Sequence, residues 1–364
     1  MLSVDHGRVN IEPATLRRPS YAARGSGGGD PLADRLPGLL LAVGVAAAAT
    51  ALAQEIPIVG GPVLGIVFGV ALASARKPSL GLQPGIAFAG GSVLRAAVVL
   101  LGAQLSLGEI ARIGVQSLPV LLGTLAVCLL LAAWLGRLLD IPSDLRTLVG
   151  VGTGICGASA IAAVTPVIGA AELDVAFAIS TIFLFNVSAV LLFPILGHQV
   201  GLGQHAFGVF AGTAVNDMSS VVAAATTYGS AAAHTAVVVK LTRTLMIIPI
   251  CLGLAAIERR RNRASIPGPD PVHAPVATAK LVPGFLLAFL ALAAANSAGV
   301  IPASSHHALG QAATLLITIA LSAVGLSTDI GGLRQTGPRP ILLGAALWVA
   351  VSATSLGLQQ LSGL

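Results

Sequence analysis

The sequence predicts an all-α polytopic membrane protein, and three observations carry that prediction. Of the 364 residues, 55% are hydrophobic and only 9% are charged, with a mean hydropathy of +0.91. A soluble domain has about a quarter charged residues, so the composition excludes an ordinary globular enzyme. Apolar segments of roughly 18 residues or more, the length that a helix needs to cross a bilayer, recur along the chain. Glycine is abundant and aromatic residues make up only 4%, which favours a tightly packed helical bundle over a β-barrel.

A polar stretch, residues 1–35, has the composition of a disordered cytoplasmic tail, and residues 36–364 form the predicted transmembrane domain. Within the connection 258–280, arginines are followed by prolines, so we expect a flexible basic loop beside anionic headgroups. The eleven predicted spans are 36–54, 57–75, 86–107, 113–136, 145–168, 173–200, 205–228, 231–257, 281–298, 308–326 and 339–360.

The order of features suggests an internal inverted repeat, which is common in transporters. The segments GIVFGVAL at 65–72 and GVFAGTAV at 208–215 fit one pattern, and five spans of offset make them antiparallel. The next helix carries a central basic residue in both cases, Arg95 and Arg243. We therefore expect one extra helix and then two inverted five-helix repeats, at about 57–200 and 205–360.

The basic residues predict the orientation. With the N-terminus inside, 16 of the 20 Lys and Arg residues fall in the tail and the inner loops. The outer loops hold Arg112 as their only basic residue, together with Glu55, Glu109, Glu172 and Asp174. Cytoplasmic loops are enriched in Lys and Arg, so we expect a cytoplasmic N-terminus and an extracytoplasmic C-terminus. The formal charge of +6 is thereby explained by topology, and we expect no nucleic-acid partner.

Four charged residues fall near the middle of predicted spans: Arg95, Asp217, Lys240 and Arg243. Each costs about 2.5–3.5 kcal/mol on insertion scales, which makes it a functional hypothesis. Lys240 and Arg243 are three residues apart and share a helical face. Three cations against one carboxylate leave two unpaired positive charges, which favours an anionic substrate. The alternative is a structural network in which Asp217 neutralises one cation.

Two spans have interrupted helical patterns. Segment 145–168 contains four glycines within residues 150–157, each of which weakens a helix by about 1 kcal/mol, and segment 205–228 has a patch rich in hydroxyl and amide groups at 212–220. A half-helix that begins after such a break aims free N–H groups at a ligand. Besides Arg243, Lys240 and Arg95, the predicted substrate-binding residues are Gly152, Thr153, Gly154, Gly157, Ser159, Thr213, Asn216 and Ser219. Asp217 is the predicted coupling-ion residue.

Other small and polar residues have simpler interpretations. We expect Gly65, Gly69 and Gly208 to permit close helix crossing, and Asn186 to bridge helices. The three cysteines lie in apolar runs at unrelated spacings, which indicates core residues rather than a disulfide or zinc site. There is no Walker A sequence and no H-x-x-x-H pair. We therefore expect a protein that is not an enzyme and needs no cofactor or metal.

Four blocks of sequence resemble the YeiH-type bacterial inner-membrane proteins, which are commonly labelled sulfate exporters. The resemblance runs from about residue 36 to the end. It implies a cell inner-membrane location, an inverted-repeat fold with crossed, unwound helices, secondary transport of the kind found in the cation:proton antiporter and anion transporter superfamily, and a homodimer. The blocks are Pro84–Ile86 with Leu100–Leu107, Gly152–Ile161, Ala211–Met218, and Lys240–Arg243 with Pro249.

These features lead to one functional hypothesis and two alternatives. The hypothesis is a secondary transporter of a small anion, such as sulfate or another sulfur oxyanion or sulfonate, with alternating access and H⁺ or Na⁺ coupling through Asp217. The first alternative is a cation:proton antiporter in which Asp217 carries the ion and Lys240 competes with it. The second is a receptor or scaffold in the membrane that transports nothing. The surplus of positive charge disfavours the first alternative, and no sequence feature excludes the second.

Overall fold

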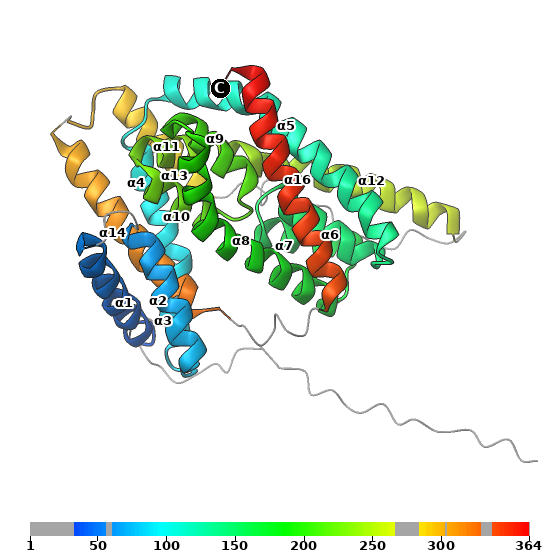
Figure 1. Cartoon of the computed structure of the whole chain (residues 1–364), viewed down its shortest axis with the longest axis horizontal. Helices are drawn as coiled ribbons and strands as arrows, with labels where there is room; N and C mark the ends of the chain where they lie inside the picture. Colours follow the sequence, from blue (N-terminus) through cyan, green and yellow to red (C-terminus); the bar gives the residue numbers. More distant parts are fainter. Residues whose placement is uncertain (1–32, 56–59, 266–283, 303, 329–336, 364) are drawn as a thin grey trace, which may run out of the picture.

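A computed structural model describes residues 33–55, 60–265, 284–302, 304–328 and 337–363, and all regular structure within these ranges is helical (Figure 1). The all-α polytopic fold is thus confirmed. The predicted tail lies almost wholly outside the described residues. The basic connection begins differently from the prediction, because α12 continues as helix to Ser265; residues 266–280 lie outside the described ranges. The helices are α1 Leu36–Glu55, α2 Gly61–Ala75, α3 Gln83–Phe88, the π-helical turn η1 Ala89–Val93, α4 Leu94–Gly102, α5 Leu107–Leu138, α6 Ser143–Gly154, α7 Ala158–Ile168, α8 Glu172–Val200, α9 Gln204–Ala214, α10 Met218–Tyr228, α11 Ser230–Leu245, α12 Ile247–Ser265, α13 Gly284–Ser297, α14 Ser305–Leu326 and α16 Pro338–Ser362.

The helix ends gather at two opposite faces of the molecule. One face holds the start of α1, the end of α2 and the start of α16, where Arg35, Arg76 and Arg339 lie, and we call it the basic end. Gln54 near the end of α1 and His307 near the start of α14 line a common pocket at the other face, which we call the opposite end. The chain's last helix also finishes at the opposite end (Figure 1).

Helices α9 and α10 form a re-entrant hairpin instead of a crossing. The Tyr228 hydroxyl at the end of α10 donates a hydrogen bond to the carbonyl of Leu202, just before α9, and the Tyr228 and Phe207 rings stack with 3.8 Å between their centroids. The Ala231 N–H donates to Gln204 Oε1 at 3.1 Å. The chain therefore enters and leaves at the same end. Because Thr226 lines the pocket with Gln54 and His307, this is the opposite end.

Helices α6 and α7 form a second re-entrant hairpin that enters from the basic end. Asp144 at the start of α6 interacts electrostatically with Asp174 at the start of α8, whereas a straight 24-residue helix would separate the two ends by about 36 Å. Helix α7 also packs on α12, and a pocket at the same end joins α6 to the end of α5 and to α12. The two hairpins thus enter the molecule from opposite faces.

The structure confirms that segments 145–168 and 205–228 are interrupted, and it corrects their path, because both turn back at mid-depth. Each arm has 11 or 12 residues, so it reaches about 16–18 Å, roughly half of the hydrocarbon thickness. Among the described residues, seven of the other nine predicted segments correspond to helices long and apolar enough to cross a membrane, and the remaining two, α2 and α13, are shorter apolar helices. Glu172 and Asp174, expected outside, lie at the basic end. The division into two five-helix repeats stays a prediction. The hairpins do not occupy matching positions in it, because 145–168 is the fourth segment of the first predicted repeat and 205–228 is the first segment of the second.

The helices pack as two bundles joined by a narrow seam. The first bundle contains α1, α2, α3–α4, α13 and α14, and the hairpin bundle contains α5 to α12 and α16. The seam is formed by α10 against α2 and α14 and by α13 against α5. In Figure 1, α1, α2 and α14 lie on the left, and the helices of the hairpin bundle extend to the right.

Small residues allow the closest contacts within the bundles, as the sequence predicts for Gly65, Gly69 and Gly208. A Cβ at Gly69 would lie 2.5 Å from the Ser322 carbonyl oxygen and 2.9 Å from Gly325 Cα, so α2 and α14 touch backbone to backbone. Gly65 meets α14 in the same way, and Gly208 meets Thr235 of α11. Helix packing in a bilayer depends on such contacts because no hydrophobic force draws apolar helices together.

Gly69→Ala should lower the melting temperature of the purified protein, because the new methyl group meets backbone atoms that cannot rotate away. Gly44→Ala is the matched control: it is also a glycine inside a helix, and a Cβ there meets nothing within 4 Å. It should leave the protein as stable or raise stability by up to about 1 kcal/mol. Equal melting temperatures for the two variants would contradict the close crossing of α2 and α14.

The re-entrant hairpins predict a specific pattern of thiol labelling. In a chain whose native cysteines are replaced, Gly203→Cys and Val300→Cys should react with a membrane-impermeant maleimide from the same side, and Ala171→Cys from the other. Eleven straight crossings would instead put residue 171 with residue 300 and leave residue 203 alone. Labelling of intact and permeabilised cells distinguishes the two patterns without any assumption about which side is cytoplasmic.

Candidate functional site

The two hairpins meet tip to tip at Gly157. This residue links α6 to α7 with φ of +68°, a left-handed conformation that glycine adopts at little cost. A Cβ there would lie 3.1 Å from Asp217 Cβ and 3.6 Å from the Asn216 carbonyl oxygen, both in the tip of the other hairpin. Glycine is therefore required here by the backbone conformation and by the close approach of the tips.

Lys240 of α11 joins the carboxyl-terminal ends of both entering arms. Its Nζ donates hydrogen bonds to the carbonyl oxygens of Ile155 (2.9 Å) and Val215 (2.8 Å), the C-cap residues of α6 and α9. The side chain is fully buried. In the middle of a bilayer these carbonyls would otherwise have no partner, because each break removes the helical N–H groups that would bond them.

Arg243, one turn further along α11, repeats this arrangement. Its guanidinium donates to the carbonyl oxygens of Thr153 (3.2 Å) and Thr213, in the last turns of α6 and α9. The side chain is fully buried, and its Nε has no hydrogen-bond partner among the described residues. Helix carboxyl termini carry about half a negative charge each, so both cations lie where two such ends converge.

The hairpin tips contain fewer unpaired positive charges than the sequence predicts. Arg95 is not part of the cluster: it is exposed on α4, where its Nε donates to the carbonyl of Gly91 at 3.2 Å. The tips therefore hold two cations and one carboxylate, a formal excess of one positive charge instead of two. The carbonyls of two helix ends compensate part of that excess. The surplus of positive charge, taken alone, does not require a bound anion.

Asp217 forms the amino-terminal cap of α10 and has a full set of donors. Its Oδ1 accepts from the Ser219 hydroxyl (2.6 Å) and the Ser220 N–H (2.7 Å). Its Oδ2 accepts from the Ser220 hydroxyl (3.0 Å) and from the Asn186 amide of α8. An ionised carboxylate offers about four acceptor positions, and all of them are used. Asp217 thereby compensates the positive end of the α10 dipole.

The amino terminus of α7 differs from that of α10. Its N-cap residue, Gly157, has no side chain to cap it, and the only side chain at its first turn is the neutral Cys156 thiol, which contacts the Ala160 N–H among the described residues. Ala158 and Ser159, its first two residues, are exposed although they lie at the tips. Asp217 and Ser219 in the facing tip are partly exposed as well. The Ala160 N–H donates to the Gly157 carbonyl oxygen at 3.1 Å, so the donors that α7 presents to an accessible region are the N–H groups of its first two residues, together with the positive end of its dipole.

The other predicted binding residues have structural contacts. Gly152 packs against Ile161 and Ile182, and Gly154 against Leu125 and Cys128, so neither faces an accessible region. The Thr213 hydroxyl bonds to carbonyls of its own helix and to Ser355 of α16. Thr153 and Thr213 reach the cluster through their carbonyl oxygens. The Asn216 N–H donates to Asn186 Oδ1 (3.1 Å), whereas its own Oδ1 is buried without a partner.

Asn186 and Ser220 are part of the site but were not among its predicted members. Asn186 links α8 to the tip at both Asp217 and Asn216, which confirms its interpretation as an interhelical bridge. Ser220 occupies the third helical position after the cap, and its contact with Asp217 follows the general rule for capped helices. An N-cap interpretation of Asp217 would have found Ser220 from the sequence. The carbonyl groups of Ile155 and Val215 could not be predicted as part of the site, because every residue has a backbone carbonyl and no residue type marks one.

Lys240→Met should destabilise the protein by on the order of 3 kcal/mol, since two buried carbonyl groups lose their only cationic donor while the volume is retained. A fall in melting temperature of roughly 5–10 °C is the expected readout. Thr242→Val is the matched control on the same helix, because that hydroxyl bonds only to the carbonyl of Val238 within α11. If Lys240→Met melts like the control, Lys240 is not needed to hold the tips together.

Comparison with known proteins shows relatives along almost the whole chain. Residues 37–344 match the family model described as "Conserved hypothetical protein 698". The chain is 43% identical over 335 residues to UPF0324 membrane protein SpyM3_0740 of Streptococcus pyogenes, which covers 91% of this chain and 98% of that protein. It is 38% identical over 351 residues to UPF0324 membrane protein FN0533 of Fusobacterium nucleatum, with 91% and 99% covered. The YeiH-type resemblance is thus confirmed, and the chain belongs to the Conserved hypothetical protein 698 family of UPF0324 membrane proteins.

Proposed function

We propose that the protein is a secondary transporter of a small anion, and that the anion binds at the hairpin tips, at the amino terminus of α7. The observation that carries the proposal is the exposure of this uncapped helix start at the point where both hairpins turn. Free N–H groups and a positive dipole end favour a negative ligand, and Ser159 adds a hydroxyl donor. Lys240 and Arg243, behind the tips, supply the remaining positive charge.

The hydrogen bonds of Asp217 favour an anion over a cation as the substrate. A carboxylate that carries Na⁺ needs oxygen lone pairs free for the metal ion, but all four acceptor positions of Asp217 are occupied by protein donors. Asp217 suits proton coupling better, because two of its donors are the Ser219 and Ser220 hydroxyls, which can rotate and accept a hydrogen bond from a protonated carboxyl group. Its negative charge lies beside the start of α7 and opposes a bound anion, so protonation would favour anion binding and link the two movements.

The two-bundle architecture is suited to alternating access. The hairpin bundle contains the complete tip cluster, and it meets the first bundle mainly through α10. Movement of one bundle against the other would expose the tips first to one side and then to the other. The relatives are named only as membrane proteins, so sulfate and other sulfur oxyanions enter this proposal as candidate substrates.

Ser159→Glu should reduce counterflow of radiolabelled sulfate in proteoliposomes by roughly tenfold or more, because a fixed carboxylate at the start of α7 repels the anion at short range. The fold should be preserved, since acidic residues stabilise the first turn of a helix. Ser159→Gln has the same size without the charge and should retain most of the activity. Equal counterflow by the two variants would remove the start of α7 from the anion path.

Asp217→Asn separates the hypotheses about coupling. For a proton-coupled anion transporter, this variant should still bind and exchange the anion but should lose uptake driven by a pH gradient. For a cation:proton antiporter, pH-driven Na⁺ exchange by the wild type would be abolished in the variant, and anions would have no effect. A wild-type protein that binds a labelled anion yet moves neither ion would support a receptor or scaffold.

A further inference from the structure

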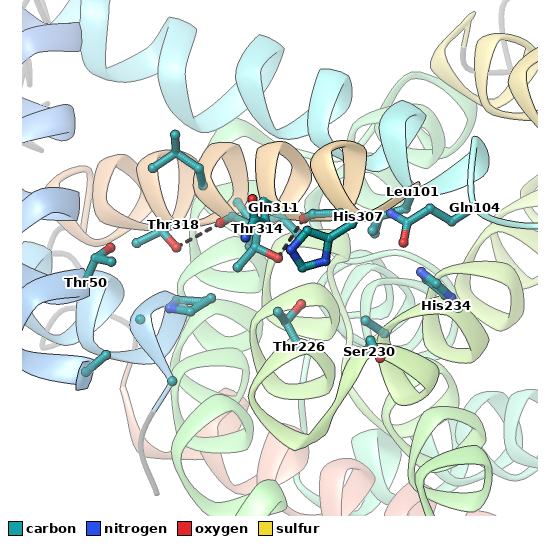
Figure 2. A pocket seen from close by; sticks show the side chains of 18 of the residues that line it. Thr50, Leu101, Gln104, Thr226, Ser230, His234, His307, Gln311, Thr314 and Thr318 are labelled. Atoms are coloured by element: carbon teal, nitrogen blue, oxygen red, sulfur yellow. Dashed lines mark hydrogen bonds between the residues drawn. The ribbon is translucent and has the colours of Figure 1, made fainter. Parts of the chain in front are cut away.

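A second polar cavity lies at the opposite end, in the seam between the bundles. It has a volume of about 910 Å³ and is walled by α1, α2, α4 and α14 of the first bundle and by α10 and α11 of the hairpin bundle. In Figure 2, Gln104 and His234 lie on one side of this cavity, Thr50 and Thr318 on the other, and Thr226 and Ser230 line the wall below. The cavity is distinct from the tips, since none of the residues that line it belongs to the tip cluster.

The cavity is rich in hydrogen-bond donors. The described residues that line it include no Asp or Glu, but they include three histidines, three glutamines and several hydroxyl groups. Glu109 lies outside the lining and interacts electrostatically with His234. Its carboxylate accepts hydrogen bonds from the N–H and the hydroxyl of Ser106. One wall is apolar and contains Leu101, Leu315 and Ile317.

Two buried donors in the cavity lack partners. Gln104 Nε2 and Thr226 Oγ1 have no hydrogen-bond partner among the described residues. Thr226 is unusual in this respect, since Thr314 and Thr318 in the same cavity and Thr227 beside it all donate to carbonyls of their own helices. Buried polar groups are rarely left unpaired, so each of these two unused donors marks a place in the cavity wall where a ligand or water can accept a hydrogen bond.

The Gln104 amide packs against Gly310, where a larger residue would crowd it. A Cβ at Gly310 of α14 would lie 3.2 Å from Gln104 Oε1 and 3.5 Å from Nε2. Glycine at this position therefore lets the amide lie against α14. The donors come from the turn after α4 and from α10, on the two sides of the seam.

We propose that this cavity is an entry site for a small organic anion, with its oxyanion group bound by Gln104 and Thr226 and its body against the apolar wall. The volume exceeds what a bare inorganic anion needs and suits a carboxylate or sulfonate with a short carbon chain. The site rests on the proposed transport function, since it would receive the substrate before the tips do. Because both bundles wall it, their relative movement would change its shape.

Cysteine labelling with reagents of opposite charge tests the ligand class. In a chain without native cysteines, Gln311→Cys places a thiol in the cavity wall, and Val300→Cys places one at the same end outside it. The purified full-length variants are treated with sulfonatoethyl methanethiosulfonate and with its trimethylammonium counterpart. Each labelling rate is divided by the rate at which the same reagent reacts with the thiol of free glutathione, which corrects for the reagent's own reactivity. The anionic-to-cationic ratio should be about fivefold or more higher at residue 311 than at residue 300. A ratio at residue 311 equal to or below that at residue 300 would overturn the proposal.

Protection by methanesulfonate, a small organic sulfonate, tests the named donors. It should slow labelling at residue 311 and not at residue 300. Adding Gln104→Leu and Thr226→Val, which remove both donors without changing charge, should raise the concentration for half-protection about tenfold or more. Undiminished protection in that variant, or protection by glycerol as strong as by methanesulfonate, would overturn the proposal.

Parallel counterflow assays separate this proposal from the transport function. If methanesulfonate protects residue 311 through the two donors but no anion crosses the membrane, the cavity binds anions and the transport proposal fails. If sulfate counterflow occurs and depends on Ser159 but methanesulfonate gives no protection, the transport proposal stands and the entry site is overturned.

Discussion

The structure depends on how the backbone of two broken helices is satisfied in the middle of a membrane. Each break leaves carbonyl groups at the end of one arm and N–H groups at the start of the next, in a region where water cannot complete them. Lys240 and Arg243 supply donors to both sets of carbonyls, and Asp217 with Asn186 completes one set of N–H groups. The hairpins can therefore turn at mid-depth only because α11 and α8 pass beside their tips.

This arrangement divides the tip region into two poles. The carboxyl-terminal ends of α6 and α9 face the cations, and the amino-terminal ends of α7 and α10 lie near Asp217. Three of the four helix ends are compensated by side chains of the chain itself. The start of α7 is the one without a side-chain cap, and it is also exposed. The functional proposal follows from this difference between four otherwise similar helix ends, and no longer from a count of charges.

The sequence was informative wherever a residue type has a strong physical preference. Runs of apolar residues predict every helical segment, and the glycines at 150–157 and the polar patch at 212–220 predict both breaks. Lys240, Arg243 and Asp217 are identified as special because ionisable groups in a span are costly. Arg95 satisfied the same rule but lies on an exposed face of α4, because hydropathy gives the segment and not the direction of its side chains.

The path of the broken segments could not be derived in this way. A mostly apolar stretch of 24 residues has the same hydropathy whether it forms one crossing helix or two half-length arms, so the sequence predicts 145–168 and 205–228 as crossings. Lys240 and Arg243 likewise bind backbone carbonyls, which every residue has and which no sequence pattern marks. The sequence by itself determined the membrane fold, the positions of the breaks and the three central charges. The tertiary structure alone decided that the breaks are hairpin tips from opposite faces, because only packing brings Gly157 and Asp217 together and shows which helix ends lack a partner.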